Sequence, residues 1–214
     1  MTKLTRRGLL AAAPLFGLRA QTTEHGFTPL FDGRTLNGWQ LAGGRGPGYI
    51  VKDGMIVCPA DGGGNLFTTR EYANFVLRLE WRFWEGGNNG IGIRTPFGGH
   101  GSTDGMEIQV LDDESEKYKA LKPTQFTGSI YDVFPARRGF VKRDGAWNSF
   151  EITAGGSHVK VVLNGETVVD ADLASVTDAA VLKKHPGLRR PCGCIGLLGH
   201  GTHVEFRNIR VREL

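Results

Sequence analysis

Apolar and polar residues alternate with a period of two along much of the chain. Between Tyr72 and Trp84 every second residue from Phe75 to Phe83 is apolar, and the residues between them include Arg78, Glu80 and Arg82. Successive side chains of a strand point to opposite faces, so this pattern predicts a strand with one buried face. Shorter segments with strand-like patterns are 48–57, 90–94, 106–111, 148–153, 158–163, 166–169, 194–198 and 204–212.

Turn signals separate these segments. Asp53-Gly54 and Asn164-Gly165 each lie between two apolar runs, which predicts tight hairpins, and the glycine- and asparagine-rich stretch 86–90 predicts a turn. Leu173–Lys184 is the one segment in which we expect a short helix. At least nine short strands at this spacing predict an all-β sandwich or jelly roll, whose first and last strands we expect to pair.

The first twenty residues differ from the rest. A basic start with Arg6-Arg7 precedes a short apolar run that ends near Ala20, which is typical of a signal peptide. The arginine pair resembles the twin-arginine export signal, and an ordinary Sec signal is the alternative. We therefore expect a signal peptide at 1–20, a single domain at 21–214, and an exported protein in the periplasm or outside the cell. No cysteine lies near the cut, so we expect no lipid anchor in a membrane.

Charge and cysteine content narrow the function classes. The chain has a formal net charge of +4, but residues 1–20 contain four basic and no acidic side chains, so the remainder is near neutral. The near-neutral charge of the remainder gives no reason to expect a nucleic-acid partner. Cys58, Cys192 and Cys194 are an odd number, and we interpret them as buried small residues, an interpretation that allows one disulfide to Cys58. A metal or redox pair at Cys192-Gly-Cys194 is the alternative.

Several segments then match one family in order. They are Phe31–Trp39 (FDGRTLNGW), Asn89–Arg94 (NGIGIR), Gly105–Asp112 (GMEIQVLD), Thr127–Tyr131 (TGSIY), Trp147-Asn148 with Leu163–Gly165, and Gly196–Gly201 followed by Val204–Ile209. Across residues 27–214 the chain resembles the 3-keto-disaccharide hydrolase domain family. The resemblance implies a concanavalin-like jelly roll of two antiparallel sheets, and an exported enzyme with a carbohydrate substrate, a 3-keto-glycoside. The chain departs from the family at Leu198-Gly199, where Gln-Asp is frequent before His-Gly.

A ketone at C3 of a sugar acidifies the proton on C2. Removal of that proton allows elimination of the C1 substituent, and water can then add back, so the site needs a base, an electrophile and an acid. We expect Glu107 or His200 to be the base, with Arg94 and Tyr131 assisting. Each has a structural alternative. Glu107 would then lie on a solvated sheet face and His200 in a turn. Arg94 would form a surface ion pair, and Tyr131 would pack at the edge of the core.

Four further residues are candidates for substrate binding. Gln109 shares a strand face with Glu107, Trp84 lies on the polar side of its strand, and Asn89 and Asp112 fall within the family segments. We make no assignment of metal ligands. A divalent cation remains a candidate cofactor, because His203 lies near His200 and an acidic loop follows position 111. The sequence does not determine the oligomeric state.

Two other functions fit the same pattern. A lectin-like, non-catalytic carbohydrate-binding module would use the same fold, because fold alone does not define function. The spacing Glu107-x-Gln109-x-x-Asp112 also resembles the strand of jelly-roll β-glucanases that carries their paired carboxylates. Those enzymes are retaining glycosidases. Such an enzyme needs two carboxylates on one face, whereas Asp112 is expected on the other.

Overall fold

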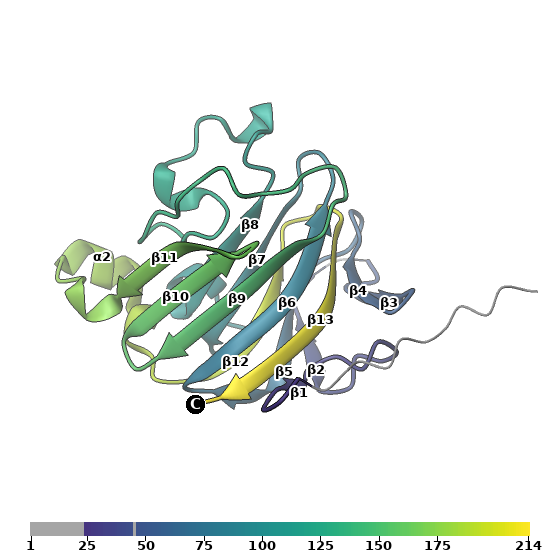
Figure 1. Cartoon of the computed structure of the whole chain (residues 1–214), viewed down its shortest axis with the longest axis horizontal. Helices are drawn as coiled ribbons and strands as arrows, with labels where there is room; N and C mark the ends of the chain where they lie inside the picture. The colour runs from purple at the N-terminus through teal and green to yellow at the C-terminus, as the bar shows by residue number, and fades with distance from the viewer. Residues whose placement is uncertain (1–23, 45) are drawn as a thin grey trace, which may run out of the picture.

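The computed structural model describes residues 24–44 and 46–214, so the predicted signal peptide lies outside the described residues. Two antiparallel sheets pack face to face, and Figure 1 shows the larger one in front of the smaller. The larger sheet has the order β11 (Glu166–Asp172), β10 (His158–Leu163), β9 (Asn148–Gly155), β6 (Phe75–Phe83), β13 (Val204–Glu213), β4 (Met55–Cys58) and β3 (Ile50–Lys52), with β1 (Thr28–Pro29) also paired to β13. The smaller sheet has the order β2 (Trp39–Ala42), β5 (Asn65–Tyr72), β12 (Gly193–Gly199), β7 (Asn88–Thr95) and β8 (Met106–Leu111). The predicted all-β jelly-roll sandwich is confirmed.

The two predicted hairpins and the pairing of the chain ends are also confirmed, whereas the turn predicted at 86–90 is shorter, because β7 already begins at Asn88. Asp53-Gly54 joins β3 to β4, and Asn164-Gly165 joins β10 to β11, with Asn164 at φ 52° and Gly165 at φ 92°. Positive φ at both central residues matches the twist of a two-residue hairpin, which is why Asn-Gly is favoured there. Thr28 pairs with Val211, so the first described strand lies beside the last (Figure 1).

The core lies between the sheets and follows the predicted alternation. Leu77, Leu79 and Trp81 of β6 are buried in one apolar cluster with Ile108 and Val110 of β8. Because strand side chains alternate between faces, Glu107 and Gln109 must lie on the face of the small sheet that points away from this core.

Helices are short and lie in the connections. The helical segments are α1 (Gly101–Asp104), α2 (Ala179–Lys184) and the 3₁₀ turns Glu116–Tyr118, Pro123–Gln125, Leu173–Ser175 and Pro186–Arg189. The predicted helix at Leu173–Lys184 is therefore a 3₁₀ turn followed by α2. Among the described residues, no helix is long and apolar enough to cross a membrane.

All three cysteines are free thiols, with Cys58 and Cys194 buried and Cys192 partly exposed. The disulfide to Cys58 that the sequence interpretation allowed is therefore not formed. The interpretation as buried small residues is right for Cys58 and Cys194.

Strand β7 contains an irregularity that matters for the site. Against β12, Gly92 pairs with Gly196 but Thr95 pairs with Cys194, so β7 has one residue more than its partner over this stretch. Arg94 lies within the bulge and has φ 50°, in the left-handed region. A bulge changes the direction of the side chains that follow it.

Candidate functional site

A cavity of about 250 Å³ lies on the outer face of the small sheet. Strands β7 and β8 contribute to its floor, α1 to one side, and the segments after β8 and β12 to the rim. Its lining residues are Asn88, His100, Ser102, Glu107, Gln109, Leu111, Tyr118, Leu121, Tyr131 and His200. Four of the eight predicted site residues, Glu107, Gln109, Tyr131 and His200, thus share one cavity.

Glu107 is the only carboxylate in this lining, and its side chain is 5% exposed. Its Oε1 atom lies 3.4 Å from Nε2 of His200, and the imidazole is 45% exposed at the rim. A Cβ added at Gly90, in the adjacent strand, would lie 2.1 Å from the same Oε1 atom. The glycine in β7 therefore makes the space that the Glu107 carboxylate occupies.

Tyr131 is held next to Glu107 by the backbone. Its N–H donates to the Glu107 carbonyl at 2.8 Å, and its phenol oxygen accepts from Nε2 of Gln125 at 2.9 Å. Burial, and to a smaller degree the Glu107 carboxylate, raise the pKa of Tyr131 above its ordinary value. The phenol consequently remains protonated at neutral pH and can donate a hydrogen bond into the cavity.

Gln109 presents an unused acceptor. Its Nε2 donates to Oδ1 of Asn88 at 3.1 Å, while its Oε1 is buried without a hydrogen-bond partner among the described residues. An unpaired buried carbonyl is unfavourable by about 1–3 kcal/mol, so a hydroxyl donor that enters the cavity would relieve that cost.

Two predicted residues of β7 lie elsewhere. Arg94 is 2% exposed, and its guanidinium donates to the carbonyls of Ala73 and Gly156, away from the cavity. The bulge in β7 is the physical reason, because regular alternation would keep Arg94 on the face of Gly90 and Gly92. The expectation that Arg94 assists at the site is corrected.

The predicted substrate contact of Asn89 is also corrected, because its side chain lies on the face of β7 that points away from the cavity. It is fully buried, donates to the Tyr49 hydroxyl at 3.3 Å, and accepts from the N–H of Gly90. The cavity is lined instead by its neighbour Asn88. The error is one residue, which in a strand moves the side chain to the opposite face.

Trp84 follows β6, on the other sheet. It is 42% exposed, stacks edge-on against His203 with ring centroids 5.0 Å apart, and does not line the cavity. The prediction that Trp84 binds substrate is corrected for this cavity, because β6 belongs to the larger sheet.

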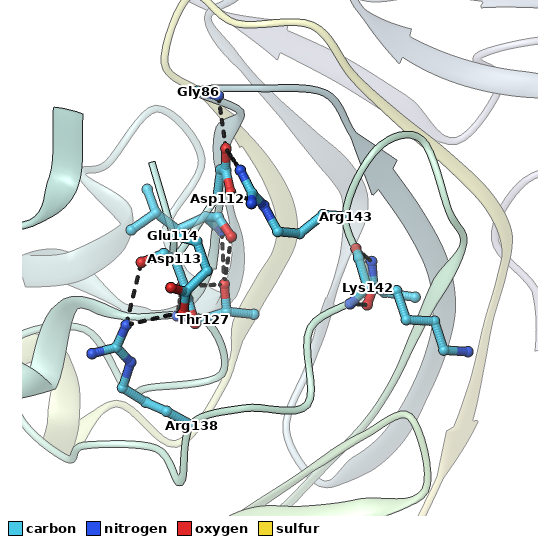
Figure 2. Close-up of polar contacts among 10 residues, drawn as sticks. Gly86, Asp112, Asp113, Glu114, Thr127, Arg138, Lys142 and Arg143 are labelled. Carbon is cyan, nitrogen blue, oxygen red and sulfur yellow. Dashed lines mark hydrogen bonds and ion pairs between the residues drawn. The ribbon is translucent and has the colours of Figure 1, made fainter. Parts of the chain in front are cut away.

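Asp112 is fully buried in an ion pair instead of lining the cavity. Figure 2 shows its carboxylate between the guanidinium of Arg143 and the N–H of Gly86. The Arg143 Nε–Oδ1 distance is 2.8 Å and the Gly86 N–Oδ2 distance is 3.0 Å. The predicted substrate contact of Asp112 is therefore corrected to a structural tie between the β6–β7 turn, the end of β8 and the segment that contains Arg143.

Six lining residues were not among the predicted site residues, namely Asn88, His100, Ser102, Leu111, Tyr118 and Leu121. Asn88 could have been found by testing the neighbour of Asn89, and Leu111 lies within the family segment Gly105–Asp112, but no motif pointed to the other four. His100 and Ser102 reach the site because α1 packs beside β7 and β8, and the Ser102 hydroxyl lies 3.2 Å from Nδ1 of His100.

The departure at Leu198-Gly199 has a steric explanation. A Cβ at Gly199 would lie 2.8 Å from the Gly64 carbonyl oxygen and 3.1 Å from the Cys58 sulfur, so an aspartate here would require a shift. Leu198 is 3% exposed in a small apolar cluster with Phe67 and Cys194 on the outer face of the small sheet.

Within residues 24–44 and 46–214, no three His, Cys, Asp or Glu side chains form a group that could hold a metal ion. The sequence-based suggestion of a divalent cation thus gains no ligand set from these residues.

Comparisons with known proteins point to one family. Residues 26–212 match the model of the 3-keto-alpha-glucoside-1,2-lyase-like domain. A 3-keto-disaccharide hydrolase of Bacteroides thetaiotaomicron is 29% identical, over 96% of this chain and 84% of that protein. A crystal structure from Parabacteroides distasonis, provisionally named a glycosyl hydrolase, has 30% identity and a TM-score of 0.77, and covers 88% of this chain and 99% of that one. The carbohydrate-binding module CBM66 of Bacillus subtilis shares the fold alone, with 13% identity, a TM-score of 0.55, and coverage of 82% of this chain and 96% of that one.

Proposed function

Because the chain belongs to the 3-keto-alpha-glucoside-1,2-lyase-like domain family, we propose that it is an enzyme that cleaves the glycosidic bond of 3-keto-glycosides. The observation that carries this proposal is the buried Glu107 carboxylate, 3.4 Å from the His200 imidazole, in one cavity with the Tyr131 phenol. Base, acid and hydrogen-bond donor are the three groups that elimination next to a ketone requires.

The positions of the groups suggest their roles. Glu107 lies on the cavity floor and removes the proton from C2 of the sugar. Tyr131 donates a hydrogen bond to the C3 oxygen, where negative charge develops as the enolate forms. His200, at the half-exposed rim, is where the leaving group reaches solvent, so it delivers the proton to the departing oxygen.

Water is the only reactant that these steps need besides the substrate. The enolate electrons re-form the ketone as the C1–O bond breaks, which leaves a C1–C2 double bond conjugated with the ketone. Water then adds at C1 and gives a proton to His200, while Glu107 returns its proton to C2. The net reaction is hydrolysis, and a reaction that stops before water addition is that of a lyase.

The proposed test uses a 3-keto-glucoside, its parent glucoside and the purified chain. We expect turnover of the keto-sugar alone, with deuterium incorporated at C2 when the reaction runs in D₂O. Glu107→Gln should lower kcat by roughly 10²–10⁴-fold, the usual contribution of a positioned general base. Glu166→Gln is the matched control, because Glu166 is exposed and its side chain makes no hydrogen bond or ion pair with a described residue. The product mass distinguishes hydrolysis from elimination.

The two other functions predict different results. A lectin-like module would bind the sugar without turnover, and Glu107→Gln would leave binding unchanged. A β-glucanase would cleave the unoxidised glucoside with no deuterium at C2. The retaining mechanism needs two carboxylates about 5–5.5 Å apart, whereas Glu107 is the only carboxylate among the described residues that line this cavity.

We further propose that residues 1–20 direct export to the periplasm or the exterior through the twin-arginine route. Fractionation of cells that express the full chain tests this. Replacing Arg6-Arg7 by a lysine pair should retain the protein in the cytoplasm, whereas unchanged export would support the Sec alternative.

A further inference from the structure

A second cavity, of about 360 Å³, shares no lining residue with the Glu107 cavity. It lies among the β5–β6 turn, the β9–β10 turn and the segment Leu188–Pro191. Its lining contains three arginines, Arg94, Arg189 and Arg190, and no aspartate or glutamate. A concave site with this charge balance is complementary to an anion.

Arg94 is a buried cation without a carboxylate partner. Its guanidinium donates to the carbonyls of Ala73 at 2.8 Å and Gly156 at 2.7 Å and to Oδ1 of Asn74 at 3.3 Å, and all three acceptors are neutral. None of the ion pairs among the described residues includes Arg94, and burial lowers its pKa. A buried charge is normally paired with an opposite charge, so this site lacks a counterion.

Arg190 provides an independent observation. Its Nε is buried with no hydrogen-bond partner, and its guanidinium makes no hydrogen bond or ion pair with a described residue. Arg189 is held in place, since its guanidinium donates to the carbonyls of Leu173 and Val176. Glu71, the carboxylate that contacts the nearby Cys192 thiol, makes no ion pair with any of the three arginines.

We propose that Arg94, Arg189 and Arg190 form a second binding site, for a small oxyanion such as sulfate, phosphate or a sugar carboxylate. The planar guanidinium fork matches two oxygens of each of these groups. Arg94 supplies buried positive charge, and Arg190 supplies the unused donors. The site is separate from the proposed chemistry and does not depend on it.

Thermal unfolding of the full chain tests the proposal, with sodium sulfate, phosphate or glucuronate titrated at constant ionic strength. We expect saturable stabilisation by at least one of the three, and the preferred anion identifies the source. Sulfate stabilises most proteins non-specifically, so the decisive comparison is between variants. Arg190→Ala should weaken apparent binding about tenfold or more, because it removes the charge-assisted donors. Arg34→Ala, which removes an exposed arginine without side-chain partners among the described residues, should bind as the natural chain does.

A second variant supplies the missing negative charge. Ala73 is exposed and lines the cavity, so Ala73→Asp should raise the unfolding temperature without added anion and reduce anion binding. Equal stabilisation of the natural chain and Arg190→Ala by all three oxyanions would overturn the proposal. Turnover of the 3-keto-glucoside by Arg190→Ala is expected to be unchanged, so failure of this site and failure of the proposed activity are distinguishable.

Discussion

At the residue scale, the candidate site depends on Gly90 as much as on the Glu107 carboxylate. The Glu107 side chain lies where a Cβ of Gly90 would be, with its Cγ and Cδ both 2.7 Å from that position. The carboxylate therefore has room to approach His200 because the opposite strand has no side chain there.

We predict that Gly90→Ala disables the site without unfolding the chain. The methyl group would displace the Glu107 carboxylate, and a misplacement of about 1 Å can reduce turnover roughly 100-fold. Turnover of the 3-keto-glucoside and a thermal melt measure the two effects. Gly155→Ala is the control, since Gly155 is also a strand glycine but its Cβ would meet nothing within 4 Å. Equal activity of the two variants would contradict this account of Gly90.

At the element scale, the irregular segment after β8, which contains Tyr118, is tied through the β6–β7 turn to the end of β8. The Tyr118 hydroxyl donates to the Gly86 carbonyl at 3.0 Å, while the Gly86 N–H donates to Asp112. A second tie, visible in Figure 2, joins Asp113 to Thr127 through the backbone N–H and the hydroxyl, both at 2.9 Å. Tyr118 lines the cavity, so these contacts position one wall of the site.

We predict that Asp112→Ala destabilises the fold more than it changes substrate affinity. The substitution leaves the Gly86 N–H and the Arg143 guanidinium without their acceptor, which is unfavourable by about 1–3 kcal/mol. Urea unfolding measures the free energy, and steady-state kinetics measures KM. Glu85→Ala removes an exposed carboxylate nearby and should be near neutral. A large increase in KM with unchanged stability would instead restore the substrate contact first expected for Asp112.

At the scale of the whole molecule, largely buried carboxylates that accept hydrogen bonds from basic side chains set the acid limit of stability. Burial raises the pKa of Glu205, but hydrogen bonds from His203 and Arg82 outweigh it, so the pKa is lowered below its ordinary value. Burial also raises the pKa of Asp132, but the hydrogen bond from Lys184 and the positive charges of Lys184 and Lys122 outweigh it, so this pKa is lowered as well. At Asp113 burial outweighs the hydrogen bonds from Thr127, so the pKa of this carboxyl is raised.

We predict that the free energy of unfolding falls as the pH decreases from about 5 to 3. A carboxylate whose pKa is lower in the folded state stabilises the fold above its unfolded pKa, and this contribution is lost as the pH falls through the folded pKa. Glu205→Gln cannot titrate, so it should be less stable at pH 7 and should lose less stability on acidification. Urea unfolding at several pH values measures both slopes, with Glu166→Gln as the control. Parallel slopes for Glu205→Gln and the natural chain would contradict the prediction.

The sequence by itself determined most of the strands, the two hairpins and the pair Glu107 and Gln109, because alternation and Asn-Gly or Asp-Gly turns are local properties of the chain. Strands β1, β2 and β5 were not predicted. The motifs of the resemblance also indicated Tyr131 and His200. Only the tertiary structure decided which face each β7 residue presents, since the bulge at Arg94 and the register that exposes Asn88 in place of Asn89 depend on pairing with β8 and β12. It also decided that Asp112 is paired with Arg143, and that three arginines from β7 and the segment before β12 meet in one cavity. Contacts between residues far apart in the chain have no local signature, and a shift of one residue in a strand reverses the face of a side chain.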